Sequence, residues 1–240
     1  MIAEVRRALI STSGTAALTD WALNTGVTAW SSSADGAEEG GDWCDVVAIS
    51  EDTIALTVGD VAGHGEAVAA TMASMRASVL RGVHNFRAPS EILSVVNGVA
   101  CSHGDGVIVT AIVAFLNYRL RTLAFANAGH PPPLLLSGKG EAYLAHRPAD
   151  VPLGVFPNHR SADFVIALPL DAMLVLYTDG ITEHARDPVQ GEVELRKAAR
   201  DVFERPEADA AQAIALQVLR ERRGSDDAAV LALRTANQAS

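Results

Sequence analysis

Four aspartates stand beside glycines at the ends of apolar runs, where carboxylates could act together on one ligand. They are Asp42 after Gly40-Gly41, Asp60 after Gly59, Asp179 before Gly180, and Asp226 after Gly224-Ser225. A strand end holds a carboxylate rigidly, and a neighbouring glycine leaves the backbone open to a ligand. Aspartate and carbonyl oxygens without clustered histidine or cysteine favour Mg²⁺ or Mn²⁺ over zinc. A single Asp-Gly or Gly-Asp pair is also ordinary turn chemistry, so the spacing alone leaves both interpretations open.

The reaction that suits such a group of carboxylates is hydrolysis at phosphorus. Two divalent ions about 3.5 to 4 Å apart can share a carboxylate, acidify a bridging water and stabilise an in-line attack. The sequence shows no obvious covalent nucleophile that would argue for a phosphoenzyme instead.

The elements that must position these residues are mostly short strands. Apolar runs bounded by turn residues predict strands at 27–30, 46–49, 54–58, 107–116, 123–127, 134–136, 164–168, 173–177 and 229–233. Apolar residues spaced by three and four predict helices near 66–82, 90–100, 193–203 and 208–222. Strands in hairpin-length succession do not form a βαβ array. We therefore expect an α+β domain of two mostly antiparallel sheets with helices on the outer faces.

Composition restricts the partners of the chain. It has 240 residues, 49% of them hydrophobic, and a formal net charge of −10, which repels nucleic acid and anionic lipid. The two cysteines, Cys44 and Cys101, support neither a disulfide framework nor a zinc cluster, so we expect a reducing cytoplasm. The longest apolar runs fall far short of the roughly 20 residues of a membrane span, and polar residues interrupt the apolar stretch near the start, so we expect no export signal.

Six motifs in a fixed order carry a family resemblance. They are GGDWCD at 40–45, GDVAGHG at 59–65, AGHPP at 128–132, PLG at 152–154, LYTDGITE at 176–183 and the pair Asp226-Asp227. In this order they resemble the metal-dependent PPM-type (protein phosphatase 2C-like) serine/threonine phosphatases. The resemblance is to the bacterial branch of the stage II sporulation phosphatase and the stress-response regulator phosphatases, and it covers about residues 25–234.

The resemblance implies a four-layer αββα sandwich with two Mn²⁺ or Mg²⁺ ions at one edge. It divides the chain into an N-terminal extension at 1–24, the phosphatase domain at 25–234 and a tail at 235–240. Transferred position by position, Asp42 and Asp60 bind the metals, with Asp60 bridging both, and the carbonyl of Val61 adds a ligand. Asp179 and Asp226 complete the second metal's ligands.

The remaining motif residues are expected to act around these ligands. Glu183 is expected to support the metal ligands, to act on an auxiliary third ion, or to be a solvated side chain. His64 could donate a proton to the leaving serine oxygen, but a turn that places the Val61 carbonyl is favoured. His130 is expected to fix a loop by hydrogen bonds. Asp45 and Asp227 are expected to support the neighbouring ligands.

Three departures from the family pattern stand out. Cys44 replaces a usual aromatic residue, and inert burial is the favoured interpretation over an oxidisable thiol. Ala229 stands near a common threonine, so one supporting hydrogen bond is expected to be missing. Nothing resembles the phosphate-binding arginine on the N-terminal strand of many eukaryotic relatives, which predicts weak substrate binding without docking contacts.

The function that the resemblance implies is direct attack of metal-bound hydroxide on phosphoserine or phosphothreonine of a regulatory protein. In this branch the usual substrate is a phosphorylated anti-sigma factor antagonist. The alternative is a catalytically weak or inactive binding module with the same fold. We expect control in trans, by an activating partner or a homodimer. The helix pair 66–100 resembles the branch's regulatory switch, with Ser74, Arg76 and Arg81 predicted to point outward.

Overall fold

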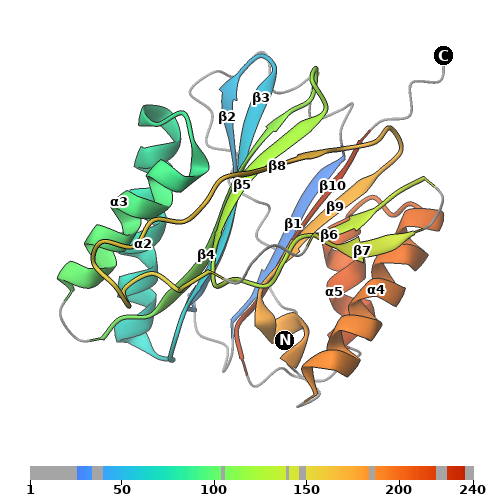
Figure 1. Cartoon of the computed structure of the whole chain (residues 1–240). Coiled ribbons are helices and arrows are strands. Elements are labelled where there is room, and N and C mark those ends of the chain that lie inside the picture. Colours follow the sequence, from blue (N-terminus) through green and yellow to red (C-terminus); the bar gives the residue numbers. More distant parts are fainter. Residues whose placement is uncertain are drawn as a thin grey trace.

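Two five-stranded antiparallel sheets face each other, and helices cover the outer side of each (Figure 1). The computed structural model describes residues 26–33, 40–103, 106–138, 141–145, 150–183, 187–219 and 226–235. Sheet A has the order β2 (Asp42–Ser50), β3 (Thr53–Val61), β4 (Val109–Asn117), β5 (Thr122–Ala128) and β8 (Phe164–Ala167). Sheet B has the order β1 (Val27–Ser32), β10 (Ala228–Arg234), β9 (Met173–Tyr177), β6 (Leu134–Leu136) and β7 (Ala142–Leu144).

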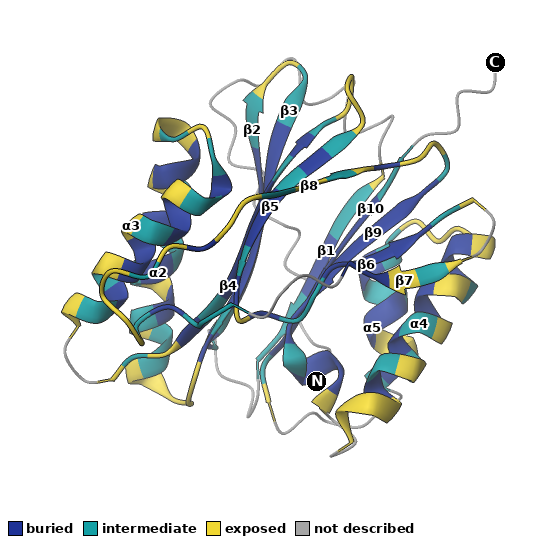
Figure 2. Cartoon of the chain, in the orientation of Figure 1, coloured by how far each residue is buried: buried dark blue, intermediate teal, exposed yellow. Residues whose placement is uncertain are grey.

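The helices form the two outer layers. Helices α2 (Glu66–Asn85) and α3 (Pro89–Ser102) pack on sheet A, and α4 (Pro188–Glu204) and α5 (Ala210–Leu219) pack on sheet B. In Figure 2 the buried residues follow the sheets and the inner faces of these helices. The α+β class and the four-layer αββα sandwich expected from the sequence are confirmed.

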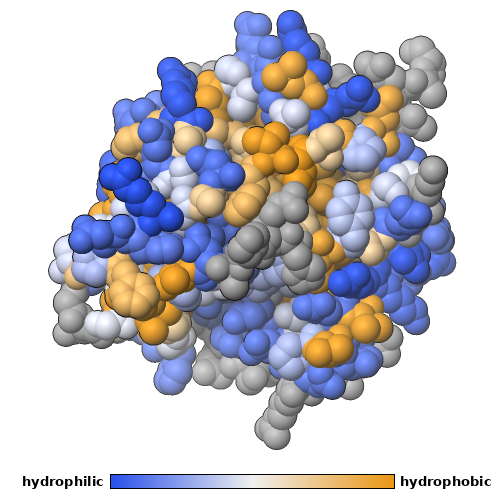
Figure 3. Space-filling view, viewed as in Figure 1, coloured by the Kyte–Doolittle hydropathy of each residue, from blue (hydrophilic) through white to orange (hydrophobic). Residues whose placement is uncertain are grey.

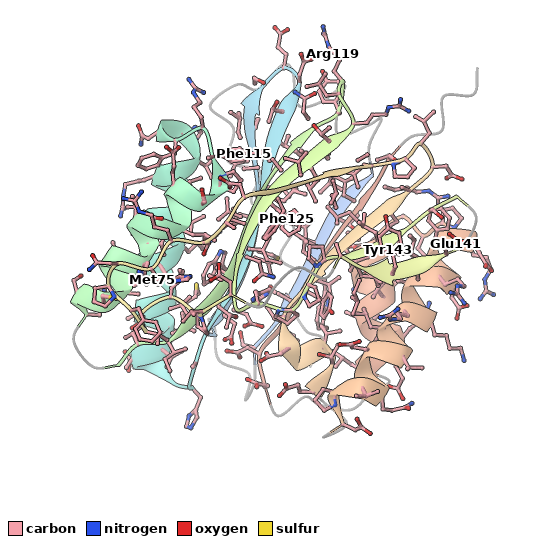
Figure 4. The ribbon with its side chains drawn as sticks, viewed as in Figure 1. Met75, Phe115, Arg119, Phe125, Glu141 and Tyr143 are labelled. Atoms are coloured by element: carbon pink, nitrogen blue, oxygen red, sulfur yellow. The ribbon has the colours of Figure 1, made fainter. Side chains whose placement is uncertain are left out.

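Alternation along the strands divides the core into three layers. On β4, Val113 packs under the helices of sheet A, whereas the preceding Ile112 packs between the sheets. Figure 4 labels Met75, which belongs to the layer between α2 and sheet A, and Phe125, which belongs to the layer between the sheets. Because side chains alternate with a period of two, each position's parity decides which layer it enters.

The predicted element boundaries are wrong in several places. Strand β2 begins at Asp42 and not at residue 46, β4 runs from 109 to 117, and the short β7 was not predicted. Helix α4 begins at 188, five residues earlier than expected, because Asp187 accepts hydrogen bonds from the N–H groups of Val189 and Gln190. Residues 220–222 of the predicted last helix, the extension at 1–24 and residues 236–240 of the tail lie outside the described residues.

Exposed apolar side chains gather near the middle of the face shown in Figure 3, where β8 crosses in Figure 1. Strand β8 is an edge strand, and its Val165 is 65% exposed. Within the described ranges, no helix is long and apolar enough to cross a membrane.

Candidate metal centre

Asp42 and Asp60 lie side by side at one end of sheet A. They are cross-strand partners in the β2–β3 pair, at the end away from the hairpin turn, which is the lower end in Figure 1. Asp42 has the same parity as Cys44 and Asp60 the same parity as Val58, and both of these residues pack between the sheets. The two carboxylates therefore enter the layer between the sheets, where cross-strand Cβ atoms are about 5 Å apart.

Sheet B meets this pair through Thr178, which follows β9. The Thr178 hydroxyl donates to Oδ2 of Asp42 at 2.7 Å and accepts the N–H of Ala229 at 2.8 Å. Thr178 is fully buried. Its single hydroxyl therefore joins the end of β9, the start of β10 and the first aspartate of β2, and it sets the orientation of the Asp42 carboxylate.

Asp227 makes the second connection between the sheets. Its Oδ2 accepts the N–H of Gly41 at 2.5 Å, so it holds the backbone that precedes Asp42. A Cβ at Gly180 would overlap the backbone carbonyl of Asp227, so only glycine allows the turn at Asp179 to approach the turn at 226–227 this closely. The expected supporting role of Asp227 remains a prediction, and the contact with Gly41 gives it a specific form.

The carboxylates lie close enough to one another to raise each other's pKa. Burial raises the pKa of Asp42 well above the usual range, and the charge of Asp60 raises it further. Burial, followed by the charge of Asp179, raises the pKa of Asp60 to about 6. Burial, followed by the charge of Glu183, raises the pKa of Asp179. The charge of Asp226 also raises the pKa of both Asp60 and Asp179, so it lies near each of them.

The residues fit divalent cations in their chemistry and in the space they leave. A Cβ at Gly41 would lie 2.8 Å from the carbonyl oxygen of Val61 and 3.5 Å from Oδ1 of Asp60, so the missing side chain opens the backbone beside both oxygens. Among the described residues, no three Asp, Glu, His or Cys side chains form a ready-made ligand cluster. Mutual repulsion of carboxylates is the condition that a bound cation relieves, and oxygen donors suit Mg²⁺ or Mn²⁺.

The remaining predicted residues lie around this group with different exposure. Glu183 is exposed just after the short 3₁₀ helix η2 (Asp179–Ile181), close enough to raise the pKa of Asp179. His64 is exposed in the turn between β3 and α2, and Gly63 and Gly65 on either side of it have φ values of 117° and 94°. Because this backbone needs glycine, it agrees with the favoured turn role of the motif.

Arg76 corrects one expectation about α2. Its guanidinium donates to both carboxylate oxygens of Asp45, at 2.8 and 2.6 Å, so it points toward sheet A and not outward. Asp45 is 1% exposed, and an unpaired carboxylate at that depth would be costly. This pair fixes α2 to β2 three residues from Asp42. Ser74 is half-buried, and Arg81 is exposed as expected.

Cys44 is half-buried, and its inertness remains a prediction, whereas His130 makes the hydrogen bonds that the sequence led us to expect. Burial, with the charges of Asp45 and Asp42, raises the pKa of the Cys44 thiol to about 12, which disfavours the reactive thiolate. His130 is buried and hydrogen bonded through its ring and its backbone. Sequence reasoning missed Thr178, although its place directly before Asp179 in the motif was a signal that could have found it.

Two facing antiparallel sheets, covered by helices and carrying aspartates at one end of the layer between them, define the class of PPM-type, or protein phosphatase 2C-like, phosphatase domains. The family model described as Stage II sporulation protein E (SpoIIE) matches residues 50–236 of this chain. The chain therefore belongs to the SpoIIE family, and the resemblance found from the motifs is confirmed.

Curated relatives match over part of their length. "Phosphoserine phosphatase RsbU" from Bacillus subtilis is 26% identical over 55% of this chain and 40% of its own length. "Phosphoserine phosphatase RsbP" from the same organism is 25% identical over 61% of this chain and 38% of its own length. "Protein IcfG" from Synechocystis is 27% identical over 62% of this chain and 28% of its own length. The chain thus spans well under half of these relatives.

Solved structures agree on the fold. The RsbU and RsbW domains of Rv1364c from Mycobacterium tuberculosis match with a TM-score of 0.81 and 26% identity, covering 90% of this chain and 61% of that chain. The phosphatase domain of SpoIIE from Bacillus subtilis matches with a TM-score of 0.77 and 14% identity, covering 88% and 63%. PstP in complex with two manganese ions matches with a TM-score of 0.66 and 14% identity, covering 89% and 99%.

Proposed function

We propose that this chain is a metal-dependent protein phosphatase that hydrolyses phosphoserine or phosphothreonine on a regulatory protein. The observation that carries the proposal is the meeting of aspartates from two sheets at one end of the layer between them, with raised pKa values at Asp42, Asp60 and Asp179. Membership of the SpoIIE family and the phosphoserine phosphatases RsbU and RsbP among the relatives support it.

The metal ligands are part of the proposal. The carboxylates of Asp42, Asp60, Asp179 and Asp226 and the carbonyl of Val61 would hold two Mn²⁺ or Mg²⁺ ions. Such ions supply positive charge for the phosphoryl oxygens and make a water acidic enough to attack phosphorus.

The other residues of the site keep these oxygens in place. Thr178 donates to Oδ2 of Asp42, which fixes the orientation of this carboxylate. Asp227 holds the Gly41 N–H, so the backbone beside the Val61 carbonyl keeps its position. A site fixed before the substrate arrives loses less free energy to reorganisation during the reaction.

The substrate and regulation follow from the relatives only as proposals. We propose a phosphorylated anti-sigma factor antagonist as the substrate, because the similar structure of Rv1364c combines an RsbU domain with an RsbW domain. An activating partner or a second copy of the chain would act at the α2–α3 layer, which is fixed to β2 by the Arg76–Asp45 pair. A cytoplasmic location, in keeping with two free cysteines, belongs to the same proposal.

The test is phosphate release from a phosphoserine peptide and from phosphorylated antagonist proteins, with Mn²⁺ titrated into metal-free protein. We expect turnover that requires Mn²⁺, stops with EDTA, is lost in Asp60→Asn and persists in the control Glu141→Gln, an exposed residue beside β7. Turnover by metal-free protein would contradict the mechanism. Binding of Mn²⁺ and of phosphoprotein without any turnover would favour the alternative, an inactive binding module of the same fold.

A further inference from the structure

His130 lies buried between the two sheets, and both of its ring nitrogens have partners. Nδ1 lies 2.8 Å from the hydroxyl of Thr110 on β4, and Nε2 lies 3.0 Å from the carbonyl oxygen of Tyr177 at the end of β9. Its backbone N–H donates to Oδ1 of Asn127, whose Nδ2 donates back to the His130 carbonyl, both at 2.8 Å. The residue is 5% exposed, so its ring is held on all sides.

The partners fix the direction of both ring hydrogen bonds. A carbonyl oxygen only accepts, so Nε2 of His130 must carry the proton that it donates to Tyr177. Burial lowers the pKa of His130 to about 4, so the ring is neutral at pH 7 and has a single N–H. Nδ1 therefore accepts from the hydroxyl of Thr110. The hydrogen bonds therefore run from the Thr110 hydroxyl through the imidazole to the Tyr177 carbonyl, and we call them the hydrogen-bond path.

Each end of this hydrogen-bond path lies beside one half of the candidate metal centre. Thr110 is the cross-strand partner of Asp60 in the β3–β4 pair, and its parity places it on the same inter-sheet face as Ile112. Tyr177 is two residues before Asp179 and one before Thr178. The imidazole thus connects the strand next to Asp60 with the segment that carries Asp179, two segments that belong to different sheets.

We infer that His130 is a positioning residue that sets the separation between Asp60 on sheet A and Asp179 on sheet B. The inference rests on the proposed function, because the separation matters for two carboxylates that would hold the same metal ion. A rigid neutral ring suits this role, since it cannot stretch and it adds no charge to an acidic site. The two hydrogen bonds with the Asn127 side chain hold the backbone of His130 to the end of β5, so the ring projects from a backbone position that is fixed independently of the metal centre.

The competing explanation is that His130 only anchors its own loop. Substitutions at Thr110 distinguish this explanation from a positioning role. Thr110→Val removes the hydroxyl without changing the shape and leaves the Asn127 bonds intact, whereas Thr110→Ser keeps the hydroxyl. The matched control is Thr53→Val, which removes a side-chain hydrogen bond from Asn117 at the far end of the same strand pair.

The first measurement is amide hydrogen exchange in metal-free protein, which does not depend on the proposed function. Thr110→Val should speed exchange at 178–182, where backbone bonds such as Thr182 N–H to the Asp179 carbonyl hold η2, and should leave 127–134 protected. Thr110→Ser and Thr53→Val should leave 178–182 as in the wild-type chain. If exchange in Thr110→Val becomes faster only at 127–134, or becomes faster in neither segment, the inference is overturned.

The second measurement is Mn²⁺ binding by calorimetry, with a double-mutant cycle. We expect Thr110→Val to weaken binding about three- to tenfold, the range for one lost hydrogen bond, with Thr110→Ser restoring it. His130→Gln also loses the Thr110 bond, so Thr110→Val should add little further loss to it. If the losses of Mn²⁺ affinity in the two variants simply add, Thr110 and His130 do not act through one hydrogen-bonded path, and the inference is overturned. A wild-type chain without Mn²⁺ binding or turnover would contradict the proposed function, while exchange at 178–182 still decides the role of His130.

Discussion

The two sheets contribute to the candidate metal centre in different ways. Sheet A supplies Asp42 and Asp60 from within regular strands, where each is paired in register with its neighbours. Sheet B supplies Asp179 from a 3₁₀ turn after β9 and Asp226 from the segment before β10, where it is exposed. The first pair is placed by ladder hydrogen bonds, and the second by turns.

This difference explains why side-chain hydrogen bonds connect the two sheets at this end. Turns have few backbone bonds of their own to fix them, so Thr178, Asp227 and His130 tie the sheet B segments to sheet A. The apolar layer between the sheets aligns them only approximately, because apolar contacts have no preferred direction. We infer that sheet A forms the fixed half of the site and that sheet B is brought to it by hydrogen bonds.

The largest expected effect comes from removing the central carboxylate of the fixed half. Asp60→Asn should reduce turnover about a hundredfold or more, as the loss of a central electrostatic group does in other enzymes. Asp226→Asn should cost less, because the exposed side chain can be replaced in part by water. Steady-state rates with saturating Mn²⁺ check both, with circular dichroism to show that each variant is folded. Equal losses would contradict the division into a fixed half and a tied half.

The next largest effect is expected from the Arg76–Asp45 pair. It should stabilise the half of the site that lies on sheet A, because the hydrogen bonds between its two side chains join α2 to β2. Arg76→Met leaves the carboxylate of Asp45 buried without this partner, so the free energy of unfolding should fall by about 3 kcal/mol. Asp45→Asn combined with Arg76→Met should recover part of the loss. Urea unfolding of metal-free protein measures both. If Arg76→Met unfolds at the wild-type urea concentration, the pair does not hold α2 to β2.

Thr178→Val tests whether a side chain from sheet B orients the Asp42 carboxylate on sheet A. It removes the hydroxyl that joins Asp42 to the Ala229 N–H, so Mn²⁺ affinity should fall about ten- to a hundredfold, as for other residues that orient metal ligands. Thr178→Ser is the matched control and should retain most of the affinity. Calorimetric titration decides the matter. Wild-type affinity in Thr178→Val would mean that Asp42 is oriented by its strand alone.

The smallest expected effect is the difference in pH dependence between Asp60, in the half from sheet A, and His130, which connects the two sheets. Asp60, with a folded-state pKa of about 6, binds more protons folded than unfolded, so its contribution to stability falls as pH rises from about 4 to 6. His130, with a folded-state pKa of about 4, binds fewer, so its contribution rises from about pH 4 to 6.5. The two effects oppose each other in the wild-type chain.

In metal-free Asp60→Asn only one of these effects is removed, so stability should rise more steeply between pH 4 and 6.5 than in the wild-type chain. The expected gain at pH 7 is on the order of 1–2 kcal/mol after allowance for partial solvent screening of Asp60. Thermal unfolding across this pH range provides the measurement, with Glu141→Gln as a control of equal charge change. Parallel pH profiles for Asp60→Asn and the wild-type chain would show that Asp60 carries no burial cost.

The sequence by itself determined the class of fold and, through the family resemblance, predicted the aspartates of the candidate site. Apolar runs, turn residues and helical spacing are local signals, and they predicted most strands and all four helices of the described part of the chain. The order of six motifs identified the family. The weakest local signals failed, as for the three-residue β7, whose only partner is β6, and the start of β2, where glycines and an aspartate precede the apolar run.

Only the tertiary structure decided which side chains meet. Thr178 and Asp42 are separated by 136 positions, Asp227 and Gly41 by 186, and His130 and Tyr177 by 47, so no pattern along the chain pairs them. Arg76 shows the same limit, because helical periodicity placed it outward while the buried carboxylate of Asp45 draws it inward. Parity tells which face of a strand a residue occupies, but the packing of one sheet on the other determines what lies opposite that face.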